Sequence, residues 1–259
     1  MKKKQNWLIL TLLLISISLL IFWFLTKRRE SFENLDNNFD MYVITLKQKK
    51  RMENISKQEQ KIDHKITIFD AVKGDSLDID KLIKDGLVSE KSFKDGVNYR
   101  KREIGCYMSH LNIYNLIKDS NNSGYTLILE DDFNLKTDNF LRDIDTLVST
   151  LKNNNINFDM LFLGNHMNNH GEKIIGDVYK INKNEMLLGT HCYLVDNKHI
   201  DKIINATKYI DCPIDIKLDT LCKSNKLDIY VVYPVLADQG GSDYSSIRDM
   251  SIETFVNSK

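Results

Sequence analysis

The sequence predicts an α/β fold, in which a central sheet carries helices on both faces. Short apolar runs typical of strands alternate with segments whose apolar residues recur at helical spacing. The sequence contains no internal repeat. One strand, residues 124–130, runs directly into an acidic triplet. Because ligands bind such sheets outside the carboxyl ends of strands, these observations predict a polar site at one sheet edge.

The first 26 residues are predicted to be a transmembrane signal anchor. The uncharged run 7–25 is long enough to cross a hydrocarbon core of roughly 30 Å as a helix. Trp7 and Trp23 lie near its ends, as interfacial aromatic residues do, and no small-x-small cleavage site is evident. Lysines and arginines flank both ends equally, so the positive-inside rule does not orient the helix.

A polar segment, residues 27–40, is predicted to be a short stem, and residues 41–259 a single globular domain. The apolar runs of the domain predict its strands, which are 41–46, 65–72, 124–130, 159–164, two segments around the turn at 182–185 within 178–195, and 227–234. The helices are predicted at 47–61, 77–87, 104–117, 139–151, 197–206 and 214–224. The tail 236–249, with its glycine pair and hydroxyl residues, is predicted to be a loop.

The acidic triplet consists of Glu130, Asp131 and Asp132. Residues i and i+2 of an extended chain project to the same side, so Glu130 and Asp132 can share a ligand. Hard cations such as Mg²⁺ and Mn²⁺ prefer carboxylate oxygens and leave open positions for phosphates. The alternative is a solvated junction between a strand and a loop.

Charge and cysteine content exclude several other functions. The 36 Lys and Arg residues balance the 36 Asp and Glu residues, so no nucleic-acid partner is expected. The sequence contains no P-loop or G-x-G-x-x-G motif, and no C-x-x-C pair that would indicate structural zinc. Cys106 and Cys192 lie in apolar stretches and are predicted to be core residues.

Several motifs together resemble glycosyltransferase family 25, which includes the lipooligosaccharide glycosyltransferases and the procollagen galactosyltransferases. The motifs "IGCYMSH" (104–110) and "LILEDD" (127–132), at their mutual distance, are the most specific part of the resemblance. The resemblance covers about residues 41–247. The other segments, in chain order, are "YVITLKQKKRMENI", "IFDAVKG", "DMLFLG", "GTHCYLVDNKHIDKI", "CPIDIKL" and "YPVLADQGGSDYSSI".

The resemblance implies a GT-A-like fold, a UDP-sugar or similar donor, a divalent cation (Mn²⁺, or Mg²⁺ in its place) and inversion at the anomeric carbon. The acidic triplet then corresponds to a DxD-type motif. Asp132 and Glu130 are the expected metal ligands, and Glu130 or Asp131 would hold the ribose or a metal-bound water.

Inversion requires a base that removes the proton of the acceptor hydroxyl. The "PID" motif resembles the second acidic motif of the family, which makes Asp215 the candidate base, with Asp219 and Asp211 as substitutes. The alternative for Asp215 is an acid that complements the dipole of a helix N-terminus.

The resemblance implies further donor contacts, each with a structural alternative such as a solvated helix face, a loop cap or a satisfied core histidine. These residues are Thr45, Leu46, Lys47, Arg51, Asp70, Ser109, His110, His191 and Gln239, with Ser242 and Asp243 in a late loop that closes over donor or acceptor. The arginine-rich start of the family motif is "LKQKKRM" here and lacks its proline, which puts the phosphate contacts in doubt.

The predicted function is therefore a membrane-anchored, metal-dependent inverting glycosyltransferase that moves galactose or glucose to a glycan or to a protein hydroxyl such as hydroxylysine. The alternative is a catalytically silent, anchored module that binds a carbohydrate or a partner on the same fold. A phosphoryl-transfer enzyme is disfavoured by the missing Walker loop. In a eukaryotic or viral source the domain would lie in the lumen of the endoplasmic reticulum or Golgi, and in a bacterial source on the cytoplasmic face of the inner membrane.

Overall fold

The structure is a computed structural model that describes residues 15–23, 39–62, 64–90, 97–166 and 171–240. The chain divides into two compact units, residues 1–38 and 39–259. In the first unit, residues 15–23 are helical and their large apolar side chains are exposed. Within the described part of the chain, no helix is both long and apolar enough to cross a membrane. The rest of the predicted anchor and the stem up to residue 38 lie outside the described residues, as do Ser242 and Asp243.

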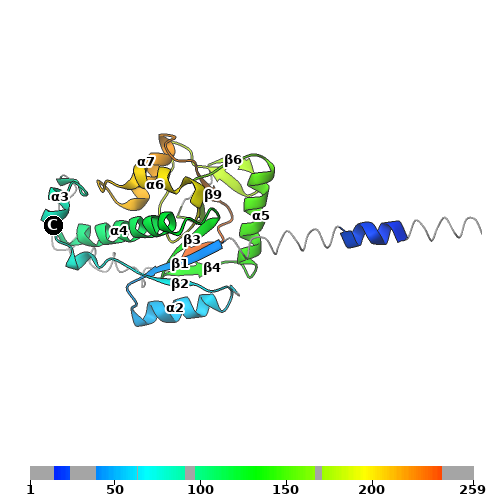
Figure 1. The fold of residues 1–259 in the computed structure, drawn as a ribbon, viewed down its shortest axis with the longest axis horizontal. Coiled ribbons are helices and arrows are strands. Elements are labelled where there is room, and N and C mark those ends of the chain that lie inside the picture. The colour runs from blue at the N-terminus through cyan, green and yellow to red at the C-terminus, as the bar shows by residue number, and fades with distance from the viewer. Residues whose placement is uncertain (1–14, 24–38, 63, 91–96, 167–170, 241–259) are drawn as a thin grey trace, which may run out of the picture. The chain divides into compact units, whose positions relative to one another are not determined.

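The second unit is a mixed α/β domain, which confirms the predicted fold class (Figure 1). Its strands are β1 (Phe39–Thr45), β2 (Thr67–Asp70), β3 (Tyr125–Glu130), β4 (Phe133–Leu135), β5 (Met160–Gly164), β6 (Glu172–Ile175), β7 (Val178–Lys180), β8 (Cys192–Asp196), β9 (Ile229–Val232) and β10 (Ala237–Gln239). Its helices are α2 (Lys49–Glu59), α3 (Ile79–Lys84), α4 (Val97–Ser120), α5 (Phe140–Asn153), α6 (Ile200–Thr207) and α7 (Ile214–Lys223), with short 3₁₀ turns η1 (Gly74–Ser76) and η3 (Asn197–His199).

The main sheet has the strand order β2-β1-β3-β8-β5-β9-β7-β6. Strands β2, β1 and β3 are parallel, β8 is antiparallel to both β3 and β5, and β9 is parallel to β5. The carboxyl ends of β1, β2, β3 and β5 therefore meet the amino end of β8 at one edge. This edge receives the chain segments that follow each predicted strand.

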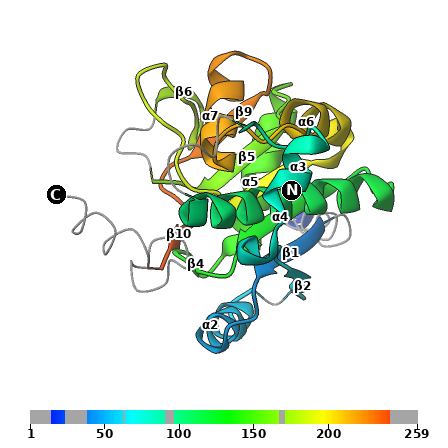
Figure 2. The ribbon, with the colours of Figure 1, turned by 90° about the vertical axis from the view of Figure 1, so that its left-hand side faces the viewer.

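Both faces of the central strands β3, β5 and β8 are buried, as expected for strands with continuous apolar runs. Side chains of one parity, including Ile44, Ile128 and Phe162, join a core with the apolar faces of α4, α6 and α7. Side chains of the other parity, such as Val43 and Leu127, are also buried, and α5 has its own buried apolar stripe. Figure 2 shows α4 crossing in front of the strands.

The structure differs from the predicted elements in several places. The second strand within 178–195 begins only at Cys192, because the preceding residues form irregular backbone whose N–H groups bond to acids of α7. The first strand predicted within 178–195 is confirmed as β7, but its hairpin partner β6 and strand β4 were not predicted, since strands of three or four residues are too short for a periodic signal. The tail 236–249 was predicted to be a loop, yet its residues Ala237–Gln239 form β10, which pairs with β4. The predicted helix at 104–117 is longer and spans α4.

Candidate active site

The acidic triplet lies where the carboxyl edge of the sheet meets α4 and the segment before β8. Asp132 is nearly buried, with 5% of its side chain exposed. Its Oδ2 atom accepts a hydrogen bond from Gln239 (2.8 Å) and lies 3.0 Å from the Arg51 guanidinium. Its Oδ1 atom is buried and has no hydrogen-bond partner among the described residues. A buried carboxylate oxygen without a partner is costly, and either a proton or a bound cation would reduce that cost.

The pKa of Asp132 shows the effect of its burial and of the carboxylate beside it. Burial and the neighbouring Glu130 carboxylate raise the pKa of Asp132 from 3.8 to about 6, although Arg51 and Gln239 oppose the change. The acid is therefore ready to lose a proton near neutral pH when a positive charge approaches.

Glu130 has the opposite environment. Its Oε1 atom accepts a hydrogen bond from the Thr190 hydroxyl (2.5 Å) and lies 3.3 Å from His110 Nε2. Burial opposes ionisation, but these contacts with His110 and Thr190 hold the pKa of Glu130 below its usual value. The two carboxylates are thus pushed in opposite directions, a pattern typical of functional pairs of acids.

His110 connects Glu130 to buried side chains of the core. Its Nδ1 atom lies 2.7 Å from the Tyr193 hydroxyl, which in turn lies 2.9 Å from the Tyr114 hydroxyl. All three side chains are fully buried, and the Tyr193 ring stacks on Phe162. The network fixes the His110 ring so that Nε2 faces Glu130. Tyr193 and Thr190 were not predicted, although both lie in the quoted "GTHCYLV" segment.

Asp131 contacts the end of β1 and helix α2. Burial raises its pKa, while a hydrogen bond with Thr45, the Arg51 charge and the Leu46 backbone lower it. The structure therefore brings these three predicted residues to the triplet. Arg51 is buried on α2 and lies 3.3 Å from Asp131, so it contacts the acids themselves and not only the space expected for phosphate.

The turn that carries the triplet is held by α2. Asn54 donates through its side-chain amide to the carbonyls of Asp131 and Phe133. Sequence reasoning did not find this residue, because a polar helical face carries no distinct signal for such a contact.

The remaining predicted donor residues divide into two groups. Lys47 and Asp70, at the ends of β1 and β2, form an ion pair with both side chains largely exposed. Ser109 is fully buried instead and points away from the acids, since its hydroxyl donates to Gly105 and accepts from the Val72 N–H. Its observed contacts are structural, because they tie α4 to the loop after β2.

That tie requires glycine. A Cβ atom on Gly105 would lie 2.6 Å from the Val72 carbonyl oxygen, and one on Gly74 would lie 2.2 Å from the Lys101 carbonyl oxygen. The two glycines therefore allow the loop after β2 to lie directly on α4.

The candidate bases lie on or before α7. Asp215 accepts from the N–H groups of Ile216 (2.8 Å) and Gly189 (3.3 Å) and contributes to the negative potential at Cys106, as Glu130 does. Asp219 is buried, and both of its oxygens are occupied, by the Leu187 N–H (2.9 Å) and by Lys223 (2.8 Å). Asp211 pairs with Lys217 at 2.8 Å. Among the described residues, Asp215 thus bonds only to backbone N–H groups, whereas Asp211 and Asp219 each form an ion pair with a lysine.

Two neighbouring histidines lie near the site. His191 is fully buried, and burial lowers its pKa to about 4 although Glu130 opposes this, so its ring is neutral. His166, which was not predicted, lies with its ring 5.0 Å from that of His191 and its Nε2 atom 2.8 Å from Gln239 Oε1. Because Gln239 also donates to Asp132, it links His166 to the acidic triplet.

Two sets of side chains can hold a cation. The carboxylates Glu130 and Asp132 form a hard oxygen set, suited to Mn²⁺ or Mg²⁺. Within the described ranges, Cys106, His110 and Glu130 form a second set, whose sulfur, nitrogen and oxygen atoms all lie within 4.8 Å of one another. Cys106 was predicted to be a core residue but is only partly buried at this position.

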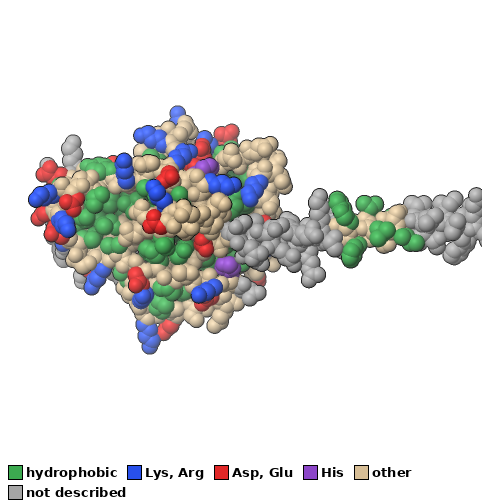
Figure 3. Space-filling view, viewed as in Figure 1, with side chains coloured by type: hydrophobic (Ala, Val, Ile, Leu, Met, Phe, Trp, Pro, Cys, Tyr) green, Lys and Arg blue, Asp and Glu red, His purple; other side chains and the backbone are tan. Residues whose placement is uncertain are grey.

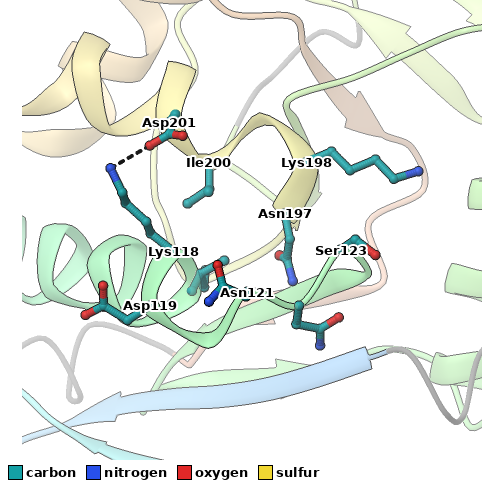
Figure 4. Close-up of a pocket in the computed structure, with 10 residues that line it drawn as sticks. Lys118, Asp119, Asn121, Ser123, Asn197, Lys198, Ile200 and Asp201 are labelled. Atoms are coloured by element: carbon teal, nitrogen blue, oxygen red, sulfur yellow. Dashed lines mark ion pairs between the residues drawn. The ribbon is translucent and has the colours of Figure 1, made fainter.

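Other surfaces are less suited to this chemistry. A surface cavity of about 490 Å³ lies at the opposite edge of the sheet, lined by the end of α4 and the start of α6 (Figure 4). Its wall includes the Lys118–Asp201 ion pair at 2.7 Å, and none of the predicted site residues. In Figure 3, acidic and basic side chains are interspersed over the visible face.

The sequence of the chain is similar to those of known proteins. The family model of glycosyltransferase family 25 (LPS biosynthesis protein) matches residues 38–218. Two relatives from Xenopus laevis are 25% identical: procollagen galactosyltransferase 1-A over 200 residues (74% of this chain, 32% of the relative) and 1-B over 230 residues (84% and 35%). The chain thus spans about a third of the length of these relatives.

A solved structure, that of A197 from STIV, aligns with a TM-score of 0.36 at 10% identity, over 77% of this chain and 83% of that chain. The family match covers well over half of the chain and includes both the acidic triplet and the "PID" motif. The chain therefore belongs to glycosyltransferase family 25, as its motifs predict.

Proposed function

We propose that this glycosyltransferase is a metal-dependent inverting hexosyltransferase with a GT-A-like site. It would transfer galactose or glucose from a UDP-sugar to a hydroxyl group of a glycan or of a protein side chain such as hydroxylysine. In the balanced reaction, the acceptor oxygen bonds to the anomeric carbon, the bond from that carbon to the diphosphate breaks, and UDP and a proton are released.

One observation carries the metal dependence. The Asp132 Oδ1 atom is buried without a partner among the described residues, while its neighbour Glu130 is held ionised. A cation bound by Asp132 and Glu130 satisfies both features. When bound, Mn²⁺ or Mg²⁺ supplies charge neutralisation for the leaving diphosphate.

The residues of the chain itself supply positioning and proton transfer. Asp131, with Thr45 and Leu46, forms the wall that would hold the ribose, and the exposed Lys47–Asp70 pair borders the space for the base. Asp215 accepts the proton of the acceptor hydroxyl. Asp219 is less suited to that role because it is buried and forms an ion pair with Lys223, whereas Asp215 is partly exposed.

We also propose that residues 1–26 anchor the enzyme in a membrane. The uncharged run between two tryptophans supports this. The catalytic domain would then face the lumen of the endoplasmic reticulum or Golgi in a eukaryotic or viral source, and the cytoplasm in a bacterial one.

The test is a donor screen on the domain from residue 39 onward, using UDP release and thermal shift with each UDP-hexose, with and without Mn²⁺. The expected result is metal-dependent turnover of one donor, with a product of inverted anomeric configuration by NMR. Failure to bind or turn over any UDP-hexose would refute the proposal.

A matched pair of variants tests the base. Asp215→Asn is expected to lower kcat at least about a hundredfold while donor binding persists, because general-base catalysis contributes about 10²–10⁴-fold. Asp219→Asn is expected to lower the melting temperature and leave kcat nearly unchanged. The opposite pattern would assign the base to Asp219.

A further inference from the structure

We propose that Cys106, His110 and Glu130 form a binding site for a thiophilic divalent cation such as Zn²⁺, which overlaps the carboxylate pair proposed for Mn²⁺ at Glu130. The binding itself is independent of the proposed function. The consequence for turnover rests on it, because the two sites share Glu130.

The helix α4 provides two of the ligands. Cys106 and His110 are four residues apart, so they lie one turn apart on the same face of α4. That face meets the end of β3, and the three ligand atoms lie within 4.8 Å of one another. A small movement of side chains would bring them around a single ion.

The ligand types favour zinc over manganese. A thiolate, an imidazole and a carboxylate match the ligands of Zn²⁺ sites, whereas Mn²⁺ and Mg²⁺ prefer oxygen. Three protein ligands leave a fourth position open, unlike the closed four-ligand sites of structural zinc. The absence of a C-x-x-C motif therefore does not argue against this site.

The residues around the three ligands suit a bound cation. His110 Nδ1 lies 2.7 Å from the Tyr193 hydroxyl, so the outer ring nitrogen already has the partner that orients a metal-bound histidine. Because either tyrosine can donate in the Tyr193–Tyr114 bond, the network can accept a proton on Nδ1 when Nε2 binds a metal. Binding replaces the thiol proton of Cys106 with the S–Zn bond and releases that proton to solvent.

The other cysteines provide an internal comparison. Cys192 and Cys222 are buried in the core, while Cys212 is partly buried like Cys106 but lies beside Asp211. Among the described residues, no other group of three or more His, Cys, Asp or Glu side chains has its ligand atoms as close together as those of Cys106, His110 and Glu130. Cys212 is therefore the matched control thiol.

The test titrates metal-free protein with Co²⁺, which gives a thiolate-to-metal charge-transfer band only when sulfur is a ligand. The expected result is a band that saturates at one Co²⁺ per chain and is displaced by Zn²⁺. It should persist in Cys212→Ser and Asp132→Asn, disappear in Cys106→Ser, and require about tenfold more Co²⁺ in Tyr193→Phe.

Alkylation of the unmodified protein provides a test that does not depend on folding of a variant. Zn²⁺ should protect Cys106, but not Cys212, from a maleimide, as read by mass spectrometry. No thiolate band, a band retained in Cys106→Ser, or equal alkylation with and without Zn²⁺ would overturn the proposal.

The two proposals fail independently. If the site exists and the enzyme is active, Zn²⁺ should inhibit Mn²⁺-supported turnover, and Cys106→Ser should relieve that inhibition at least about tenfold. A chain that shows the thiolate band but transfers no hexose would refute the proposed function alone.

Discussion

Two buried aspartates at opposite edges of the same sheet show how burial alone fails to identify function. Asp159, just before β5, is 1% exposed, and its Oδ2 atom accepts from Lys202 (2.5 Å) and from the Asp228 N–H (2.7 Å). Its Oδ1 atom lies 3.1 Å from His199 Nδ1. Asp132, after β3, is as deeply placed. In both aspartates the Oδ1 atom is buried without a hydrogen-bond partner among the described residues, but only Asp132 lies beside a second carboxylate, Glu130, that raises its pKa.

The two carboxylates differ in how far the surrounding protein compensates their charge. Asp159 is surrounded by positive and N–H groups, so its charge is compensated by the protein itself. Asp132 shares its space with Glu130, and this repulsion adds to the cost of burial. A compensated acid holds a fold together, whereas an uncompensated one is completed by a ligand.

The most severe test of this contrast is Asp132→Asn. Turnover is expected to fall at least about a hundredfold, since metal charge stabilisation is worth several kcal/mol. The melting temperature of the metal-free protein should be retained or raised, because a repelled buried charge is removed. Parallel loss of fold and activity, followed by circular dichroism, would make Asp132 structural like Asp159.

The pH dependence of stability sharpens the contrast. The folded chain holds the Asp132 proton more tightly than the unfolded chain, because its pKa rises from 3.8 to about 6. The resulting stabilisation, about 3 kcal/mol, is present below the lower value and is lost as pH rises through the higher one. In metal-free protein, wild type should lose about 6–12 °C relative to Asp132→Asn between these pH values.

The control for that measurement is metal. Mn²⁺ should bind poorly below pH 6 and restore the melting temperature of wild type above it, because it binds the deprotonated carboxylate. A melting-temperature difference between the two proteins that does not vary with pH would contradict the raised pKa assigned to Asp132.

Asp159→Asn is expected to behave in the opposite way. It should cost about 2 kcal/mol, or about 4–8 °C, since a buried acceptor loses its charge while half-exposed Lys202 can turn to water. Turnover per folded molecule should be unchanged. A large loss of kcat with intact stability, measured side by side with Asp132→Asn, would break the comparison.

The smallest effect on stability is expected for Asp70→Asn. The Lys47–Asp70 pair is exposed, so its loss should cost under about 1 kcal/mol. If Asp70 contacts the donor as proposed, the KM for the UDP-sugar should rise several-fold with kcat nearly constant. Unchanged donor kinetics would leave the pair as an ordinary surface ion pair.

The succession of strands and helices along the chain and the strand end that carries the acids follow from sequence, because their signals are local. A buried strand that ends in three acids is visible in the residues around 124–132, and the alternation of strands and helices was predicted along most of the domain. Both depend on apolar periods that act over a few residues. The family motifs then singled out Asp132 and Asp215.

Contacts between distant segments could not be predicted in the same way. The hydroxyl of Thr190 meets Glu130 only because β8 inserts between β3 and β5. Ser109 lies in the signature motif, yet its hydroxyl bonds to Val72 and Gly105. The partners of a side chain depend on tertiary packing, which one sequence without its fold does not specify.

The contact between Gly74 and Gly105 has a consequence for how this family could be diversified. Neither glycine has space for a Cβ atom, so the N-terminal part of α4 packs in one fixed position against the loop that follows β2. A substitution at either glycine would shift the helix, and with it Cys106 and His110. If Lys47 and Asp70 contact the donor as proposed, new donor preferences should arise around these exposed residues after β1 and at the end of β2. A library aimed at altered sugar use would do best to vary those residues and leave the glycine crossing untouched.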